Sequence, residues 1–494
     1  MHKNIEPTIA KMPDKKLIAW FGIIGGISLI VAFLYPQFGL LTLTSLTVIS
    51  LAYRYPRAGV WAMLIYMPFA GTVTYGIGGG NMLWRWMVDF FYIPAAIALF
   101  LRNFQQGKSL PHPKVLMLPL GLLLATCLLT LLSVNGWQQF VEPLAENEQP
   151  LMMGLMGGKA LLGYCPLMVC AYWLMRDRRD FLFLTRLLLI LAIVCCTLSF
   201  IQYGMLRAGV CQNTNELAGE DLFRASLDAR CFVGGALFYS PQHNAIDLPG
   251  TFLNPITWAW FLISTAFFSF ASTLSEPSKL WRIIGIGTII CIFIATLLSG
   301  QGVALILVPT AWIILLAVTL STAKRAIAVG AVIALMFAIA LAIAPDFFQA
   351  RVESLIGRWQ YAPPPQWLYE QFNWIVQENI GLLGQGLGRA TNSARIFGAT
   401  RLIESYHGKL LYEIGPLGIL AFLSWIFALL YLTFKSWYSL RDERWRSYGI
   451  CFWIFLVVIT VFPFYNPLRI TPINILYWFF VGVLLKLPKL EGEI

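Results

Sequence analysis

At 494 residues, with 58% hydrophobic and only 12% charged side chains, the chain is too apolar for a soluble protein, in which about a quarter of the residues are charged. The net charge of +11 and the pI of about 9.2 require no nucleic-acid partner, because membrane proteins concentrate Lys and Arg in their cytoplasmic loops. Apolar runs of roughly 17 to 25 residues, the length that crosses about 30 Å of hydrocarbon, recur from end to end. We therefore expect an all-α polytopic membrane protein, with residues 1–494 forming a single integral membrane domain.

The hydropathy pattern predicts about fourteen transmembrane helices, with twelve as the lower bound. The first apolar run is followed by many others and lacks a small-residue cleavage site, so we interpret it as a retained span and not as a signal peptide. In chain order, the predicted spans are 17–35, 37–53, 58–74, 84–101, 114–134, 158–175, 183–205, 251–273, 281–299, 301–321, 325–344, 409–434, 447–464 and 471–487.

The distribution of cations orients these spans. With a cytoplasmic N-terminus, 22 of the 35 Lys and Arg residues fall in predicted cytoplasmic segments, whereas the loops near residues 36, 135–157 and 300 contain none. The positive-inside rule therefore predicts a multi-pass protein with both termini in the cytoplasm. Three longer segments then share the outer face: 135–157, 206–250 and 345–409.

The first two outer segments differ in character. Segment 135–157 is acidic and includes Glu148, which we interpret as part of a solvated face. Segment 206–250 is an extracytoplasmic loop that holds Cys211 and Cys231, the two of nine cysteines that lie outside a predicted span. Because the side of a membrane that faces away from the cytoplasm permits disulfides, we expect these two cysteines to be joined; two free thiols are the alternative.

Charged residues inside the predicted spans are candidates for function. Arg85 and Asp89 lie four residues apart on the fourth span, so we expect them to neutralise each other. Lys159 begins the sixth span at the outer face, where it either faces an anionic ligand or extends its ammonium to the membrane surface. Glu413 lies six residues after His407, or roughly 600° of helix, so the two side chains should not share a face.

The third outer segment, 345–409, is the longest polar stretch of the chain and contains short predicted helices. Its six cations face five acids, so a net charge of +1 excludes a general polyanion-binding surface. The prolines 363–365 predict the start of an amphipathic helix that ends near Gly381 and either lies at the membrane surface or packs on the bundle as a lid. The run 381–388, GLLGQGLG, lacks the strand and lysine of a nucleotide-binding loop, so we expect a tight turn.

His407 lies near the end of this segment, after five arginines. Arginine binds phosphate through two parallel hydrogen bonds and keeps its charge, whereas histidine titrates near neutrality and can accept a proton from a hydroxyl. The combination favours chemistry on a phosphorylated substrate, although a histidine at a membrane boundary can also be a plain interfacial residue. The outer segments carry no HExxH motif and no paired His/Cys spacing, so we expect no metal site.

Three stretches between about 250 and 418 follow a recognisable order. They are PGTFLNP at 249–255; Arg358, then Trp367, then GLLGQGLG at 381–388; and SYHGKLLYEIGPLG at 405–418. With these motifs in this order, the chain resembles the O-antigen ligase and Wzy-type polymerase superfamily. Two positions depart from it. Gly300-Gln301-Gly302 stands where the family often has Ser-Arg-Gly, so a usual phosphate-binding cation is missing, and Gly408 follows His407 where the family often has Asn.

The resemblance implies an O-antigen ligase-like or polymerase-like glycosyltransferase of the GT-C type that needs neither metal nor cofactor. Its donor would be a glycan on undecaprenyl pyrophosphate at the outer face of a bacterial inner membrane, and its acceptor a second glycan or a lipid. The acceptor hydroxyl would attack the anomeric carbon of the donor with inversion. His407 would act on the acceptor hydroxyl, and Arg358, at the family's arginine position, would hold the pyrophosphate. Further substrate-binding candidates are Arg351, Arg389, Lys159 and Glu413. The bilayer and other polysaccharide-assembly proteins would be its further partners.

Two other classes remain open. A secondary transporter of a small anion would also have many spans and intramembrane charges, but it should show repeated halves, and the sequence shows no such symmetry. A scaffold for polysaccharide export is the third possibility. The choice between ligase and polymerase is open as well, because both need the same chemistry.

Overall fold

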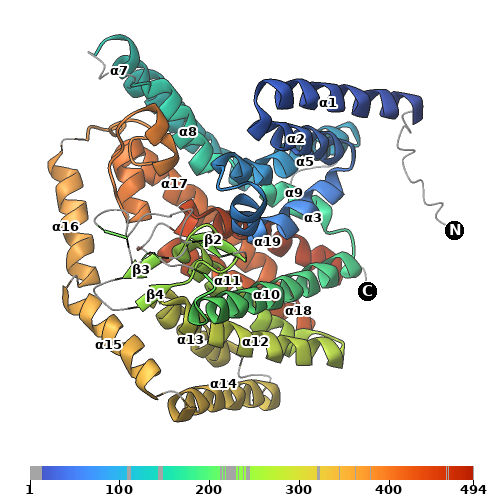
Figure 1. Cartoon of the computed structure of the whole chain (residues 1–494), viewed down its shortest axis with the longest axis vertical. Coiled ribbons are helices and arrows are strands. Elements are labelled where there is room, and N and C mark those ends of the chain that lie inside the picture. Colours follow the sequence, from blue (N-terminus) through green and yellow to red (C-terminus); the bar gives the residue numbers. More distant parts are fainter. Residues whose placement is uncertain are drawn as a thin grey trace.

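The computed structural model shows an almost entirely helical protein with two short antiparallel strand pairs (Figure 1). The structure describes residues 14–107, 113–142, 148–211, 214, 217–218, 230–231, 233–236, 238–240, 245–319, 323–343, 345–361, 363–378, 380–462, 464 and 467–492. The strand pairs are β1 (Arg230–Cys231) with β2 (Gly234–Ala236) and β3 (Phe238–Ser240) with β4 (Ala245–Asp247), all within the predicted second outer loop.

The α-helices of the first half are α1 (Asp14–Leu34), α2 (Pro36–Arg54), α3 (Pro56–Tyr66), α4 (Ala70–Thr72), α5 (Met87–Gln105), α6 (Pro113–Leu129), α7 (Gly136–Phe140), α8 (Pro150–Leu162), α9 (Leu167–Leu174) and α10 (Arg178–Arg207). Of these, α2, α3, α6 and α8 begin at a proline, and α10 follows the capping residue Asp177. Short 3-10 or π turns join some of these helices: η1 (Met67–Phe69), η2 (Val73–Ile77), η3 (Met82–Trp86) and η4 (Thr130–Asn135).

The second half alternates long helices with the short helices of the third outer segment. These elements are α11 (Pro255–Ser275), α12 (Lys279–Ser299), α13 (Gly302–Thr319), α14 (Ala323–Ile343), α15 (Pro345–Tyr361), α16 (Pro364–Gln377), η9 (Asn392–Phe397), α17 (Tyr406–Tyr438), α18 (Glu443–Val461), η10 (Pro467–Arg469) and α19 (Thr471–Glu491). The predicted helix after prolines 363–365 is therefore present as α16, and it ends four residues before Gly381.

Eleven helices in the described part of the chain are long and apolar enough to cross a membrane, so the protein is a multi-pass membrane protein. The predicted number of about fourteen is only partly confirmed. The remaining three predicted spans, 17–35, 37–53 and 325–344, correspond to shorter apolar stretches, Gly22–Leu34, Phe38–Arg54 and Gly330–Ala342. These stretches lie within α1, α2 and α14.

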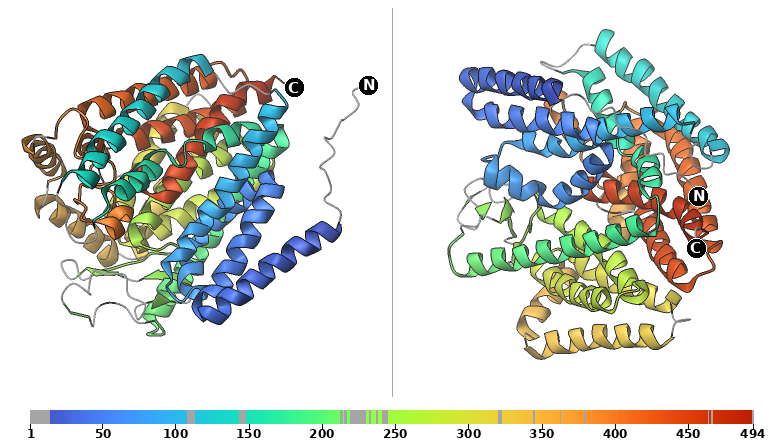
Figure 2. Two further views of the ribbon diagram at one scale, coloured as in Figure 1. Left: turned by 90° about the horizontal axis from the view of Figure 1, so that it is seen from above. Right: turned by 90° about the vertical axis from the view of Figure 1, so that its right-hand side faces the viewer.

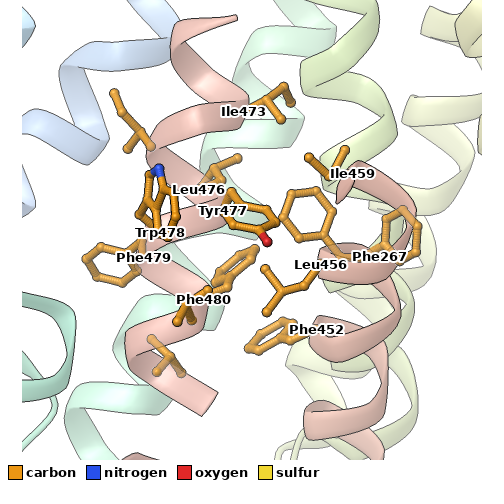
Figure 3. Packing of buried hydrophobic residues seen from close by; sticks show 14 of the residues in the cluster. Phe267, Phe452, Leu456, Ile459, Ile473, Leu476, Tyr477, Trp478, Phe479 and Phe480 are labelled. Atoms are coloured by element: carbon orange, nitrogen blue, oxygen red, sulfur yellow. The ribbon is translucent and has the colours of Figure 1, made fainter. Parts of the chain in front are cut away.

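The core of the bundle is built around α11 and α19. Buried residues make up 89% of the apolar stretch of α11 and 83% of that of α19, against 22% for α6, which therefore lies at the periphery. Figure 3 shows aromatic rings of α11, α18 and α19 filling the space between these helices. Phe452 stacks on Phe480 with ring centroids 4.5 Å apart, and Phe267 meets Phe455 edge-on at 5.5 Å. Such close ring packing fixes these three helices relative to one another.

The two ends of the bundle differ. In Figures 1 and 2, the start of α1 and the end of α19 lie toward one end, whereas the strand pairs, α15 and α16 lie toward the other. This arrangement agrees with the predicted placement of both termini on one side and of the second and third outer segments on the opposite side. We refer to these as the predicted cytoplasmic end and the predicted outer end.

Candidate active site

Residues 381–391, here called the glycine strap, pass between α8 and a kink in α17. Gly384 and Gly388 have φ of +77° and +84°, which disfavours any other residue. A Cβ on Gly384 would stand 2.6 Å from the carbonyl carbon of Glu413, and one on Gly388 would overlap the carbonyl oxygen of Met153. The run that we expected to form a tight turn is thus also a close-packed connector between two helices.

The strap completes the hydrogen bonding of the kinked helix. Gly415 interrupts α17 with φ 68° and ψ −175°, and Pro416 follows it without an N–H. The carbonyl of Tyr412 therefore lacks its helical donor, and the N–H of Gln385 donates to it at 2.8 Å. Gly386 N–H likewise donates to the Glu413 carbonyl at 3.2 Å. The Gly-Pro pair and the strap are consequently one structural unit.

The first outer segment holds the other side of the strap. Asn135, at the end of η4, donates its side-chain amide to the Leu387 carbonyl at 3.0 Å and accepts from the Leu387 N–H at 2.9 Å. The Thr130 hydroxyl donates to the Leu383 carbonyl at 3.1 Å. The first and third predicted outer segments therefore lie side by side, as their shared predicted location implies.

Glu413 anchors the strap to α17 from within. Its side chain is 1% exposed, and one oxygen accepts from the Ala390 N–H at 2.9 Å and from the Thr391 hydroxyl at 2.8 Å. The other oxygen faces the buried ammonium of Lys409 at 3.7 Å. A buried, fully engaged carboxylate positions its neighbours, so Glu413 supports the site and does not line it, unlike the substrate-binding position we expected for it.

His407 lies in the first turn of α17, which Ser405 caps by accepting a hydrogen bond from the Gly408 N–H at 3.3 Å. Tyr406 is buried against Phe422, with the His407 ring edge-on to it at 6.3 Å. The imidazole is half-buried and forms no hydrogen bond with any residue that the structure describes. It is thus fixed at the helix start with its nitrogens available.

Helix α16 packs against α17. Ile375 is fully buried, and Trp374 stacks on Tyr412 at 5.8 Å. The side-chain Oε1 of Gln371 accepts from the backbone N–H groups of Glu404 and Ser405 at 3.3 Å each. Of the two interpretations of this amphipathic helix, the contacts favour the lid that packs on the bundle. It covers the segment that leads to His407.

Several predicted substrate-binding cations already have partners. Arg389 pairs with Glu148 and also donates to the Gln138 side chain at 2.9 Å. Lys159 pairs with Asp89 at 2.5 Å and lies 3.8 Å from the centre of the Trp86 ring.

The expected Arg85–Asp89 neutralisation is wrong. Asp89 faces α8 and the turn that follows α8. One carboxylate oxygen of Asp89 accepts from the Lys159 ammonium, and the other accepts from the Tyr164 hydroxyl at 3.0 Å. The Arg85 side chain is exposed, and it forms no ion pair with another described residue.

Arg351 and Gln301 line one small cavity at the predicted outer end of α12, α13 and α15, together with Thr296 and Ser354. The Gln301 amide donates to the Asp247 carboxylate of the second outer segment at 2.7 Å. Gln301, at the position where the resemblance leads us to expect an arginine, therefore links its own loop to the second outer segment. Arg358 belongs to α15, but its side chain lies outside the described residues.

Sequence reasoning missed Arg469, in η10 between the last two spans. It is half-buried, and it interacts electrostatically with Glu413, Glu404 and Arg395. Burial lowers the pKa of the guanidinium, which still stays charged near neutrality, and burial raises the pKa of Glu404, an effect that Arg469 partly offsets. An arginine in a short outer loop is an exception to the positive-inside rule, and this exception could have identified Arg469 from the sequence.

The second outer segment is closed by a disulfide between Cys211 and Cys231, whose Cα atoms lie 5.4 Å apart. Both half-cystines are buried. The link ties the strand β1 to the end of α10. It lies outside the strap and the His407 region, and we assign it a structural role.

Comparison with known proteins adds no family assignment: neither protein-family models nor curated proteins match the chain. The chemistry that the site can carry out is therefore inferred from its geometry. A half-buried imidazole that forms no hydrogen bond with a described residue lies at a capped helix start, next to a lid. The same helix carries a buried Lys409–Glu413 pair that interacts with Arg469. Such a site can accept a proton and hold an anion.

Proposed function

We propose that the protein is a membrane glycosyltransferase of the O-antigen ligase or polymerase type. It transfers a glycan from undecaprenyl pyrophosphate to a hydroxyl of a glycan or lipid acceptor at the outer face of a bacterial inner membrane. The observation that carries the proposal is His407, held without a hydrogen-bond partner among the described residues at the start of α17 and accompanied by the half-buried Arg469.

In this proposal, His407 accepts the proton of the acceptor hydroxyl while that oxygen forms a bond to the anomeric carbon. The bond from the anomeric carbon to the pyrophosphate oxygen breaks, and its electron pair leaves with undecaprenyl pyrophosphate. Fixed cations stabilise the leaving group as its charge develops. Arg469 is available for this role, as is Arg395, which donates a hydrogen bond to the Thr400 hydroxyl at 3.0 Å.

The supporting parts of the site explain how it stays preorganised. The glycine strap and the Gly415 kink fix the helix that carries His407, and α16 covers its start. Fixed positions matter because misplacing a catalytic group by about 1 Å costs about 10²-fold in rate. The SYHGKLLYEIGPLG motif thus supplies both the candidate base and the residues that hold it.

The experiment is transfer by the purified protein with a synthetic lipid-linked oligosaccharide in the presence of EDTA and without ATP. The proposal predicts a new glycosidic bond and free undecaprenyl pyrophosphate. Movement of the substrate across a vesicle membrane without a new bond would instead assign the protein to the transporters. If the protein neither forms the bond nor moves the substrate, the scaffold interpretation remains.

A further inference from the structure

A groove away from the His407 site runs between α10 and α12. These two helices pack side by side (Figure 1). Its walls are the apolar side chains of Leu182, Phe183, Leu187 and Ile190 on α10 and of Trp281 on α12. Arg179 and Arg186 also line it. The groove is therefore a nearly apolar channel with cations along one side.

The groove opens on the surface that faces lipid. Phe183 and Ile190 are 50% and 46% exposed, and their neighbours Leu280 and Ile283 on α12 are 63% and 65% exposed. Both helices are candidate membrane spans, so exposed apolar residues on them contact hydrocarbon and not water. The occupant must consequently be apolar along the groove.

The two arginines of the groove differ in their charge balance. Arg186 is neutralised by Glu276 at 2.5 Å, and its guanidinium lies 5.2 Å from the centre of the Trp281 ring. Glu276 is 1% exposed and also accepts from the Tyr448 hydroxyl at 3.3 Å. This network fixes Trp281 as a wall of the groove and leaves no net charge for a ligand.

The mouth of the groove, in contrast, carries unpaired cations. Arg178 and Arg179 in the first turn of α10, and Lys279 at the start of α12, are exposed and form no ion pair with any described residue. The nearby acids are engaged, since Asp177 caps α10 and Asp180 pairs with Arg57 at 2.9 Å. The mouth lies at the predicted cytoplasmic end, where membranes present anionic lipid head groups.

We propose that this groove binds an anionic phospholipid of the cytoplasmic leaflet. One acyl chain lies along Leu182, Leu187 and Trp281, and the phosphate lies at the mouth between Arg179 and Lys279. The cations at the mouth complement an anionic head group, and the apolar groove next to them accommodates an acyl chain. Both features point to this ligand, because basic pockets between membrane helices bind lipid head groups. The inference stands independently of the reaction at the outer end.

The test is lipid binding by the purified full-length protein, measured by native mass spectrometry with phosphatidylglycerol and phosphatidylcholine of identical acyl chains. Wild type should bind phosphatidylglycerol more tightly. Arg179→Gln and Lys279→Gln should each weaken that binding about fivefold without changing phosphatidylcholine binding, since each surface cation contributes about that much. All substituted side chains are exposed, so folding should be unaffected.

The matched control is Arg444→Gln, an exposed arginine in the first turn of α18 at the same end of the protein. It should bind both lipids as wild type does. A groove-filling variant, Leu187→Trp, should weaken binding of both lipids. Equal binding of the two lipids by wild type would overturn the proposal, as would an equal loss in the Arg444→Gln control.

Discussion

At the scale of single residues, the cations around the candidate site fall into two groups. Arg389 and Arg401 belong to ion pairs, with Glu148 and with Glu378 at 3.7 Å. Arg469 and Arg395 form no ion pair with a carboxylate among the described residues. An arginine committed to a carboxylate stabilises the fold, whereas an uncommitted one can bind phosphate. The two groups should therefore respond differently to substitution.

Arg469→Gln should lower the rate of transfer about 10²-fold with little change in the melting temperature, because a fixed cation that meets developing charge contributes about that factor. Arg389→Gln should instead destabilise the protein by about 1–3 kcal/mol, since it leaves the half-buried Glu148 without its partner. Transfer rate and thermal unfolding in detergent separate the two. Normal transfer by Arg469→Gln at normal stability would remove it from the site.

Arg358 offers a second test at this scale. If it holds the pyrophosphate, Arg358→Lys should impair transfer because it keeps the charge but loses the planar fork, and Arg358→Ala should impair it further. Initial rates at saturating and limiting donor would report the loss. An Arg358→Ala variant with wild-type rates would show that the resemblance placed the phosphate contact at the wrong arginine.

At the scale of elements, the strap between α8 and the α17 kink determines where His407 sits. Its contact with α8 is made by glycine on both sides, because Gly157 and Gly388 approach so closely that a Cβ on Gly157 would overlap the Gly388 nitrogen. The adjacent Gly158 has no atom within 4 Å of an added Cβ. Two neighbouring glycines of one helix therefore differ only in whether they face the strap.

Gly157→Ala should destabilise the protein by about 1–3 kcal/mol and lower transfer, because the strap must move away from α8. Gly158→Ala should leave transfer unchanged and raise stability by up to about 1 kcal/mol, as expected for alanine in a helix. Thermal unfolding and transfer of the two variants measure this. Equal behaviour of the pair would contradict the close packing of the strap.

At the scale of the whole molecule, the sequence predicted the features that depend on local pattern. Apolar runs located the long helices, and the three prolines located the start of α16. Eleven helices qualify as candidate spans in the described part of the chain, and α1, α2 and α14 contain shorter apolar stretches.

Features that depend on tertiary contacts could not be predicted in this way. The i, i+4 rule joined Arg85 to Asp89, but Lys159 and Tyr164 from elsewhere in the chain occupy Asp89. Arg389 likewise finds Glu148 only because the first and third outer segments meet. Arg469 is distant in sequence from the motif that contains His407, so no local pattern linked them.

The predicted orientation can be tested with a matched pair of tyrosines. Tyr369 on α16 and Tyr438 at the end of α17 are 70% and 69% exposed at opposite ends of the fold. In intact cells, a membrane-impermeant maleimide should label Tyr369→Cys and should leave Tyr438→Cys unlabelled until the membrane is opened. The reverse pattern would place the candidate site in the cytoplasm, where this donor chemistry is not expected.

The most direct measurement compares glycan transfer by reconstituted wild type, His407→Ala and His243→Ala, with lipid-linked donor and EDTA. His243 is in the second outer segment, lies outside the described residues and belongs to none of the motifs. We predict that wild type and His243→Ala form the glycosidic bond, while His407→Ala is slower by about 10²–10⁴-fold at unchanged melting temperature. Wild-type transfer by His407→Ala, or no transfer by wild type, would contradict the account.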